Sequence, residues 1–497
     1  MKRRIPIFYS ALLLTGVNLL LRTVSTSFQV YVSGRIGAAG VGLLQLVLSV
    51  GALATTAGIA GIRTATMYLT AEELGKRKPQ NVPWILSGCM LYSILCSFAV
   101  GLLLHFFAPV IAQLWIGDPR TAGALRLLAS TLPLACLCGC MTGYFTAANR
   151  IGTLAAVEVA EQLCAMGVTL SALHFWAGTD PGKACQAVVL GSCAGAMLTF
   201  LSLFLLRLAD RQKPGNPVPT RKRILDIALP LALADDLKVG INTAENLMVP
   251  KRLALYPGAA DPLAQFGMVC GMVFPVMMFP AAILFGLNEL LIPELARCNA
   301  AGSRHRIRYL VRRGLRIALL YGVLCCGILW LLSDWLCVKL YSNPEAGIYL
   351  RRFSLLVPML YCDAITDAMS KGLGQQKICV RYNILTSALD VLFLFILLPK
   401  YGMGGYFFSF LVTHVINFAL SLQLLLKVTG EKIHWKLPAA ALSGMGLAIG
   451  AATTIGGYPG KILAYLAVLW CLLTFCNVVG KEDLQWLRGL FRAKTAA

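Results

Sequence analysis

The chain has 497 residues, of which 58% are hydrophobic and only 13% are charged, and its formal net charge is +22 at pH 7. A soluble domain averages about 25% charged residues, so this composition excludes an ordinary string of soluble domains and indicates that lipid is the solvent. The basic residues form no stripe interleaved with aromatic residues on a soluble domain, which argues against nucleic acid as a partner.

Long apolar runs without Asp, Glu, Lys or Arg recur along the whole chain. A helix needs about 20 such residues to cross the hydrocarbon core, whereas a membrane barrel would show alternating segments of about ten residues. We therefore predict an all-α polytopic membrane protein with about 14 transmembrane helices, in two pseudo-symmetric six-helix bundles plus two C-terminal helices. The predicted spans are 8–32, 38–68, 83–108, 122–147, 154–176, 185–208, 224–250, 263–293, 314–336, 350–372, 382–400, 405–427, 437–457 and 461–480.

Most of the 44 Lys and Arg residues fall in alternate loops of this scheme. Cytoplasmic loops are enriched in Lys and Arg, so the bias predicts an even number of helices with both termini in the cytoplasm. The first apolar run is too long for a cleavable signal peptide and predicts an uncleaved anchor. The basic segments are residues 2–4, 76–78, Arg150, 207–223, 297–316, 371–381, 427–436 and the tail from 481.

A polar segment at 209–223 with three prolines separates the chain into two parts and predicts a linker. Residues 143–163 resemble residues 371–392, and both segments join the fourth and fifth predicted helices of their halves. Such duplications are typical of transporters, whose site lies near the membrane midplane. The predicted domains are an N-terminal bundle (1–208), the linker (209–223), a C-terminal bundle (224–427), and two last helices with a cytoplasmic tail (428–497).

Metal and cofactor chemistry is not indicated. Most of the 17 cysteines lie inside predicted spans, and the group Cys136, Cys138 and Cys140 has neither C-x2-C spacing nor a nearby His. We interpret these cysteines as small packing residues in a reduced setting. The chain also lacks a G-x-x-x-x-G-K-[ST] phosphate loop, which argues against a nucleotide-driven engine. We predict a transporter with no cofactor and no metal, and not an enzyme.

The first predicted helix carries the most informative polar pattern. Thr15, Asn18, Arg22, Ser25 and Gln29 are spaced 3, 4, 3 and 4 residues apart, which places them on one helical face. Arg22 lies too deep to reach either surface easily, and a deep charge usually marks a functional cavity. A guanidinium binds phosphate or diphosphate through paired hydrogen bonds, so we predict a substrate-binding face. The alternative is a structural arginine that pairs with a carboxylate of the fifth or seventh helix.

A second polar face begins the second half of the chain, where Asp235, Lys238, Asn242 and Glu245 are spaced 3, 4 and 3 residues apart. We predict that Lys238 and Asn242 bind substrate and that Asp235 and Glu245 couple an ion or gate the pathway. Asp235 and Lys238 could also pair with each other within the helix. The alternative is a broken helix whose polar part is simply solvated.

The remaining charged candidates in spans are one arginine and several carboxylates. Arg63, near the inner end of the second span, is a weaker substrate-binding candidate because it can extend to the cytoplasmic surface. The carboxylates could bind a coupling proton or sodium ion, neutralise the arginines, or gate the inner mouth, although an interfacial role is favoured for the pair near the loop. They are Glu158 and Glu161 in the fifth span, Asp363 and Asp367 in the tenth, and the lower-ranked Asp390 and Glu289.

Four segments in this order resemble a known family: GRIGAAGVGLLQLVLSV (34–50), GYFTAANRIG with VEVAEQL (143–163), NTAENLMVPKRL (242–253) and FPAAILFGLNELLIPELAR (279–297). They are similar to the polysaccharide-biosynthesis, stage V sporulation protein B-like branch of the MATE-like (MOP) flippase superfamily, which is related to the lipid II flippases. The resemblance implies a V-shaped pair of bundles in the bacterial cytoplasmic membrane.

This resemblance also implies a cargo, a polyprenyl-diphosphate-linked sugar for cell-wall or spore-cortex peptidoglycan, exported by alternating access. Membrane lipids, H⁺ or Na⁺, and cell-wall synthases are the implied partners. The resemblance further suggests that the last two helices form a groove for the lipid tail.

Three alternatives are open. A drug/cation antiporter of the same superfamily would favour an acid in the first helix, where this chain has Arg22 and no acid. A polytopic glycan polymerase or ligase would need a sizeable outer loop, whereas the predicted outer loops are short. A purely structural membrane protein would have no reason to carry two charged helical faces.

Overall fold

The computed structural model describes residues 7–59, 61–76, 78–178, 180–209, 221–432 and 435–476, and in these residues every regular element is helical. The side chains of Thr15, Asn18 and Glu289 lie outside the part that the structure describes. Contacts divide the chain into two compact units: unit 1 consists of residues 1–30, 272–390 and 406–497, and unit 2 consists of residues 31–271 and 391–405. The predicted all-helical fold class is confirmed, and the domain boundaries stay a prediction.

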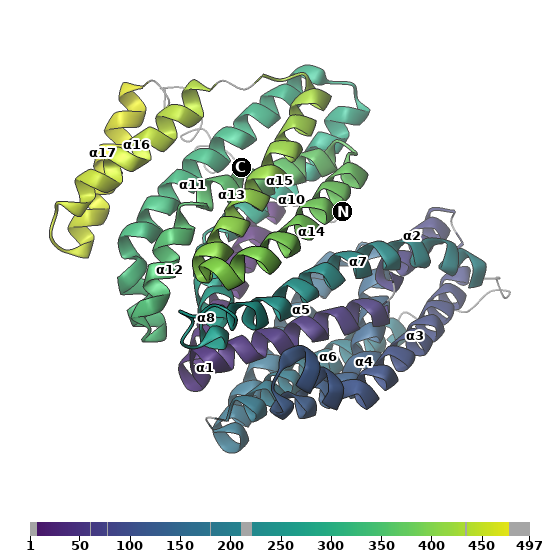
Figure 1. Cartoon of the computed structure of the whole chain (residues 1–497). Coiled ribbons are helices and arrows are strands. Elements are labelled where there is room, and N and C mark those ends of the chain that lie inside the picture. Colours follow the sequence, from purple (N-terminus) through teal and green to yellow (C-terminus); the bar gives the residue numbers. More distant parts are fainter. Residues whose placement is uncertain are drawn as a thin grey trace. The chain divides into compact units, whose positions relative to one another are not determined.

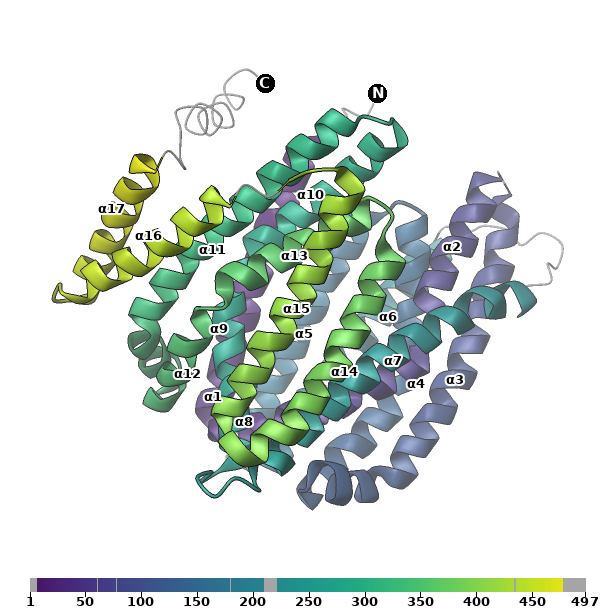
Figure 2. The ribbon, with the colours of Figure 1, turned by 45° about the horizontal axis from the view of Figure 1, so that its top comes forward.

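Unit 2 is built from the second part of α1 and the six helices that follow, together with α8. Figure 2 shows α2, α3 and α4 close together in this unit, and α2 also packs against α7. The helices are α1 (Ile7–Ile59), α2 (Ile62–Gly75), α3 (Val82–Val110), α4 (Ala122–Ala147), α5 (Ile151–Ala172), α6 (Pro181–Ala209), α7 (Arg221–Leu253) and α8 (Pro262–Met268).

Two glycines with positive φ interrupt the first 75 residues. Gly37 has a φ of 69° and kinks α1, close to the turn predicted between residues 32 and 38. Gly61 has a φ of 71° and separates α1 from α2, so the prediction of one continuous helix over 38–68 is wrong. The physical reason is close packing: a Cβ at Gly61 would collide with the carbonyl oxygen of Ala228 on α7, in a conformation that L side chains rarely adopt.

Small residues allow the helices of unit 2 to approach one another closely. Gly191 and Gly195, one turn apart on α6, lie directly against the backbone of α5. Gly101 on α3 likewise faces the backbone of α4 at Ala129. Close packing through small residues is a main source of helix association in lipid, where the hydrophobic effect between helices is weak. All 17 cysteines are free thiols, and the buried Cys136 and Cys140 are packing residues as predicted.

Unit 1 contains the first part of α1 and the remaining helices, except that residues 391–405 at the junction of α14 and α15 group with unit 2. Two predicted spans are broken near prolines: 263–293 at Pro280, and 350–372 shortly before Pro358, which cannot continue a helix without losing a backbone hydrogen bond. The helices are α9 (Phe274–Met278), α10 (Ala281–Ala300), α11 (Arg304–Tyr341), α12 (Pro344–Ser354), α13 (Val357–Gly372), α14 (Gln376–Tyr401), α15 (Met403–Thr429), α16 (Lys436–Thr453) and α17 (Tyr458–Phe475).

The last two described helices form a hairpin beside α11 (Figure 1). Tyr465 of α17 is fully buried, and its hydroxyl donates a 2.7 Å hydrogen bond to the carbonyl oxygen of Val323 on α11. The ring fits there because position 327 of α11 is glycine, and a Cβ at Gly327 would overlap the ring. One aromatic side chain therefore anchors the hairpin to the rest of unit 1.

Nine helical segments of the described residues are long and apolar enough to cross a membrane, or ten if the bent pair 262–278 and 281–300 is one span. Residues 19–75 count as one segment in this test although Gly37 and Gly61 interrupt them. The charged α7, the broken α12–α13 pair and α16 are not among the nine. The multi-pass character is thus established, while the number of about 14 helices stays a prediction.

We predict that Gly327→Ala lowers the thermal unfolding midpoint of the detergent-solubilised protein, because the added Cβ displaces Tyr465 and breaks its bond to Val323. Overpacking of this kind costs about 1–3 kcal/mol. Gly450→Ala in α16 is the control, since a Cβ there meets no atom within 4 Å. Equal midpoints for the two variants would contradict the anchoring role of Tyr465.

Candidate functional site

A polar cavity of about 230 Å³ lies inside unit 1. Most of its wall is apolar, but six side chains bring polar groups to it from three helices. Cavities with a few convergent polar groups in an apolar wall are typical of binding sites. The six are Tyr361, Asp363 and Asp367 of α13, Asn383 of α14, and His414 and Asn417 of α15.

Only one oxygen of the Asp363 carboxylate accepts a hydrogen bond from a described residue. Asn417 Nδ2 donates to Asp363 Oδ2 over 3.0 Å, and the Oδ1 of Asn417 accepts a bond of 3.3 Å from the Thr386 hydroxyl. These contacts fix the orientation of the amide between the two partners. Asp363 Oδ1 is buried and has no hydrogen-bond partner among the described residues. A buried unsatisfied oxygen beside a cavity is costly unless a ligand or proton completes it.

Two other described carboxylates of unit 1, Asp390 and Asp367, are more fully paired. Asp390 is buried and accepts hydrogen bonds from the hydroxyls of Ser409 at 2.5 Å and Thr413 at 3.1 Å. Asp367 forms a 2.6 Å ion pair with Lys371, one turn later on α13. We therefore interpret Asp390 as a structural carboxylate and Asp363 as the group that is available to the cavity.

This arrangement can hold a proton on Asp363 or a small cation beside it, because carboxylate and amide oxygens are ligands for hard cations. Within the described residues, no group of three or more His, Cys, Asp or Glu side chains could hold a metal ion. His414 Nδ1 lies 2.9 Å from the carbonyl oxygen of Phe410, which favours Nδ1 as the donor and leaves the lone pair on Nε2.

Sequence reasoning found Asp363 and Asp367 but missed their partners on the neighbouring helices. Asn383 and Asn417 are uncharged, and His414 is neutral at its ordinary pKa at pH 7, so these three residues do not stand out in the sequence as Asp363 and Asp367 do. The available signal was spacing: His414 and Asn417 are three residues apart, as are Asn383 and Thr386, so each pair shares a helical face.

The predicted face of the first helix is present in unit 1. The helix is continuous from Ile7 to the kink at Gly37, so the spacing of 3 and 4 residues does place Arg22, Ser25 and Gln29 on one side. Arg22 is exposed, while Ser25 and Gln29 are half-buried. Within unit 1, Arg22 has no hydrogen bond or ion pair with a described residue.

The predicted face of the seventh helix is present in unit 2. Helix α7 runs without a break from Arg221 to Leu253, so the alternative of a broken helix is wrong. Asp235, Lys238 and Asn242 are exposed, and Glu245 is half-buried. The idea that Asp235 pairs with Lys238 is also wrong for the described residues, because the structure has no ion pair between them.

A side of α7 that adjoins the polar face packs against α1. The hydroxyl of Thr243 donates to the carbonyl oxygen of Ser49 over 3.1 Å, and Asn246 Nδ2 donates to the Ser49 hydroxyl over 3.0 Å. These bonds fix the rotation of α7 about its axis. The side chains at 235, 238 and 242 lie beside this contact and are exposed.

The remaining predicted residues of unit 2, which are Arg63, Glu158 and Glu161, take part in two separate contacts. The exposed Arg63 is close enough to the exposed Glu158 for electrostatic attraction. Glu161 is half-buried and accepts a 2.7 Å hydrogen bond from the hydroxyl of Thr199 on α6. Glu161 therefore links α5 to α6, which supports a structural role, and its coupling role stays a prediction.

Comparisons with known proteins identify chains that are similar to this one. Residues 15–170 match the family model MatE. The chain is 22% identical over 404 residues to Stage V sporulation protein B of Bacillus subtilis (strain 168), which covers 79% of this chain and 78% of that protein.

Two solved structures are similar over most of the chain. One is the lipid II flippase MurJ in an inward closed conformation, with a TM-score of 0.66 and 12% identity over 93% of this chain and 98% of that chain. The other is an inward-facing multidrug resistance MATE family transporter of the MOP superfamily, with a TM-score of 0.65 and 13% identity over 84% of this chain and 100% of that chain. At these identities the likeness establishes the fold.

We predict that Asp363→Asn and Asp390→Asn change stability in opposite directions. Asp363→Asn removes a buried charge with an unpaired oxygen and should stabilise the protein, whereas Asp390→Asn weakens the acceptor of two buried hydroxyls and should destabilise it. Each effect is about 1–3 kcal/mol. Thermal unfolding in one detergent at one pH measures both, and a loss of stability in Asp363→Asn would show that this carboxylate is structural.

Proposed function

The chain carries a MATE family domain and has the fold of the MOP-superfamily transporters, and from this premise we propose that it exports a polyprenyl-diphosphate-linked sugar across the cytoplasmic membrane. The cargo is a lipid II-like or polysaccharide precursor for cell-wall or spore-cortex peptidoglycan. The similarity to Stage V sporulation protein B supports this branch of the superfamily. The protein works by transport between two faces of the membrane, and not by catalysis.

The observation that carries the proposal is the charge of α1. Its 53 residues contain the two cations Arg22 and Arg35 and no carboxylate. A cationic drug would be repelled by such a helix, while an anionic head group would be attracted to it. Because Arg22 is exposed and has no ion-pair partner among the described residues of unit 1, its guanidinium is available to bind a diphosphate through paired hydrogen bonds.

The positive charge of α1 and the amphipathic nature of the cargo together suggest a route for transport. The polar face of α1 in unit 1 offers hydrogen bonds from Ser25 and Gln29 to the sugar-diphosphate head, and the polar face of α7 in unit 2 offers them from Lys238 and Asn242. The polyprenyl tail stays in lipid. An inside-negative potential favours outward movement of negative charge by about 2.3 kcal/mol per charge per 100 mV. The membrane potential therefore favours export of the anionic head group.

Ion coupling is assigned in this proposal to the polar cavity of unit 1. Occupation of the unpaired Oδ1 of Asp363 by a proton or a sodium ion removes the cost of a buried charge. A ligand shifts a conformational equilibrium only by its difference in affinity for the two states. Asp363 meets this requirement if one state of the transporter closes the cavity and the other opens it.

Reconstituted vesicles test the proposal directly. Purified protein in liposomes should move a fluorescently labelled polyprenyl-diphosphate sugar between leaflets and should not exchange a cationic dye. Protein-free liposomes measure the background for both probes. Exchange of the dye without movement of the lipid-linked sugar would favour the drug/cation antiporter, and accumulation of a longer glycan would indicate a polymerase.

We predict that Arg22→Ala reduces transport of the labelled lipid-linked sugar by about tenfold to a hundredfold, the effect of losing one charge-assisted contact. Membrane insertion should be normal because Arg22 is exposed. Arg35→Ala is the matched control, since Arg35 is an exposed arginine of the same helix whose nearest bond is a 3.4 Å contact with the Tyr31 hydroxyl. Equal transport by the two variants would remove Arg22 from the binding site.

Reversing the charge of one carboxylate at a time distinguishes a transport role of the α7 polar face from a general effect of charge at the protein surface. Glu245→Lys should impair transport at least tenfold more than Glu294→Lys, because Glu245 belongs to the α7 polar face and Glu294 lies in a surface cluster. Glu294 contacts Arg306 at 2.6 Å and Arg297 at 3.5 Å, so its reversal disturbs a surface ion pair. The same liposome assay at matched protein density measures both variants, and equal tolerance would argue against a transport role for Glu245.

A further inference from the structure

The chain is interrupted between α9 and α10, at residues 276–283, which we call the α9–α10 junction. Helix α9 ends at Met278, and α10 begins at Ala281. Pro280 has no amide hydrogen, so it cannot donate to the carbonyl group four residues earlier. The amides of residues 282 and 283 bond to carbonyl groups three residues earlier, as in a tighter turn. The junction therefore lacks part of the regular backbone bonding of a helix.

Two tyrosines from neighbouring helices bind carbonyl groups of this junction. The hydroxyl of Tyr361 on α13 donates a 2.9 Å hydrogen bond to the carbonyl oxygen of Met277, and the amide of Ala281 also interacts with this hydroxyl. Met277 and Ala281 are four residues apart, so Tyr361 stands where a regular helix has its own backbone hydrogen bond. The hydroxyl of Tyr321 on α11 donates a 2.9 Å bond to the carbonyl oxygen of Pro280.

The two tyrosine rings pack against each other, and we call the pair Tyr321 and Tyr361 the tyrosine clamp. The ring centroids are 5.9 Å apart, and the ring planes differ by 20°. Tyr361 is fully buried, while Tyr321 is half-buried. Backbone groups that a break frees within a membrane segment need partners from neighbouring helices. The clamp supplies such partners at two points of the junction.

The α9–α10 junction is also a wall of the polar cavity that contains Asp363. Met278 and Ala281, on the two sides of the break, both line this cavity, and so does Tyr361. Tyr321 is not among the lining residues. The clamp is thus in contact with the cavity through one of its two tyrosines.

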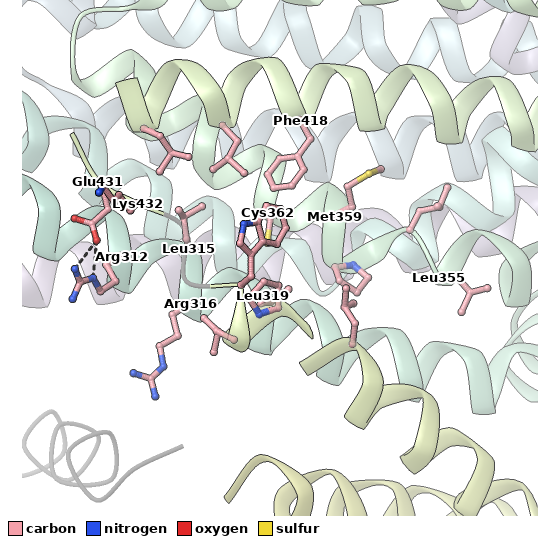
Figure 3. Close-up of a pocket in the computed structure, with 18 of the residues that line it drawn as sticks. Arg312, Leu315, Arg316, Leu319, Leu355, Met359, Cys362, Phe418, Glu431 and Lys432 are labelled. Carbon is pink, nitrogen blue, oxygen red and sulfur yellow. Dashed lines mark hydrogen bonds and ion pairs between the residues drawn. The ribbon is translucent and has the colours of Figure 1, made fainter. Parts of the chain in front are cut away.

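The two sides of α13 face different surroundings. One side, which includes Tyr361 and Asp363, lines the polar cavity. The other side lines an apolar pocket, where Figure 3 shows Met359 and Cys362 together with Leu319 of α11. The charge of Asp363 therefore acts on the side of α13 that holds the junction.

We propose that the α9–α10 junction is a hinge held by the tyrosine clamp, and that a charged Asp363 loosens this hinge through Tyr361. A charged carboxylate with an unpaired oxygen is costly in an apolar wall unless water or an ion reaches it. Water that a charged Asp363 draws into the cavity competes with the Tyr361 hydroxyl for the carbonyl oxygen of Met277. A proton or a cation on Asp363 removes this demand for water and leaves the clamp closed.

This inference deepens the ion coupling proposed above and rests on it for the role of Asp363. A coupling ion must bind two conformations of the protein with different affinities, and a held and a loosened hinge are two such conformations. Two further titratable groups line the cavity, Asp367 and His414. Asp367 pairs with Lys371, and His414 is bonded to its own helix through Nδ1, so Asp363 is the carboxylate whose occupation changes the cavity most.

The experiment measures hydrogen–deuterium exchange of the full-length detergent-solubilised protein by mass spectrometry, in peptides that cover residues 277–285. Tyr361→Phe and Tyr321→Phe each remove one hydroxyl and keep the ring. Either variant should speed exchange in these peptides by about three- to tenfold, the effect of one lost hydrogen bond. Exchange at the wild-type rate in both variants would overturn the proposal.

Tyr465→Phe is the matched control for general destabilisation. The hydroxyl of this buried tyrosine also binds a carbonyl group, that of Val323, and interacts with the amide four residues later, that of Gly327. Both groups belong to α11, so this variant loses the same kind of bond in the same unit without touching the junction. It should leave exchange in residues 277–285 at the wild-type rate, and faster exchange there, equal to that of Tyr361→Phe, would overturn the proposal.

A double variant tests the connection between Asp363 and the hinge. Asp363→Asn removes the charge and should slow exchange in residues 277–285 by about three- to tenfold. In Tyr361→Phe/Asp363→Asn this slowing should disappear, whereas in Tyr321→Phe/Asp363→Asn it should persist, because only Tyr361 lines the cavity. The same slowing with and without the Tyr361 hydroxyl would show that Asp363 acts on overall stability and not on the hinge.

The liposome assay separates this inference from the proposed function. Exchange that follows these expectations, with no movement of any lipid-linked sugar, would contradict the proposed cargo and leave the hinge standing. Transport of the sugar by the wild-type protein, with exchange in residues 277–285 that responds to neither Tyr361→Phe nor Asp363→Asn, would overturn the hinge and leave the cargo standing.

Discussion

In hydrocarbon, a polar group has no water to bind, so each buried charge must find a partner within the protein or face a cavity. This constraint explains the difference between two carboxylates of unit 1. Asp390 is enclosed by the hydroxyls of Ser409 and Thr413, and it serves to join α14 to α15. Asp363 receives a bond from Asn417 on one oxygen only, and its other oxygen has no described partner. The incompletely satisfied group is the one that lines the cavity, as expected for a site that a ligand completes.

The same constraint decides how much of the fold could be predicted from the sequence. Continuous apolar runs must become helices in lipid, and the predicted span 122–147 has the same bounds as α4. The breaks at Gly61 and Pro280 were not predicted, because a glycine or proline within an apolar run signals a break only when its neighbours in space are known. Gly61 must lie where Ala228 approaches, and that contact joins residues far apart in the chain.

The candidate sites show a similar division. Spacing on one helix was enough to predict the polar faces of α1 and α7, since both helices are continuous where the pattern lies. Spacing on one helix could not show that α14 and α15 complete the surroundings of Asp363, nor that Lys238 leaves Asp235 unpaired in the described structure. These features depend on tertiary packing, which a single sequence does not display.

The contact between Tyr465 and Gly327 has a consequence for shortened forms of the protein. Gly327 belongs to a surface of α11 that Tyr465 covers, and Tyr465 is buried there completely. A chain that ended before α17 would present this small-residue surface to lipid. Small residues on a bare transmembrane helix promote self-association, so such truncated molecules should adhere to one another within the bilayer even if the remaining helices folded normally.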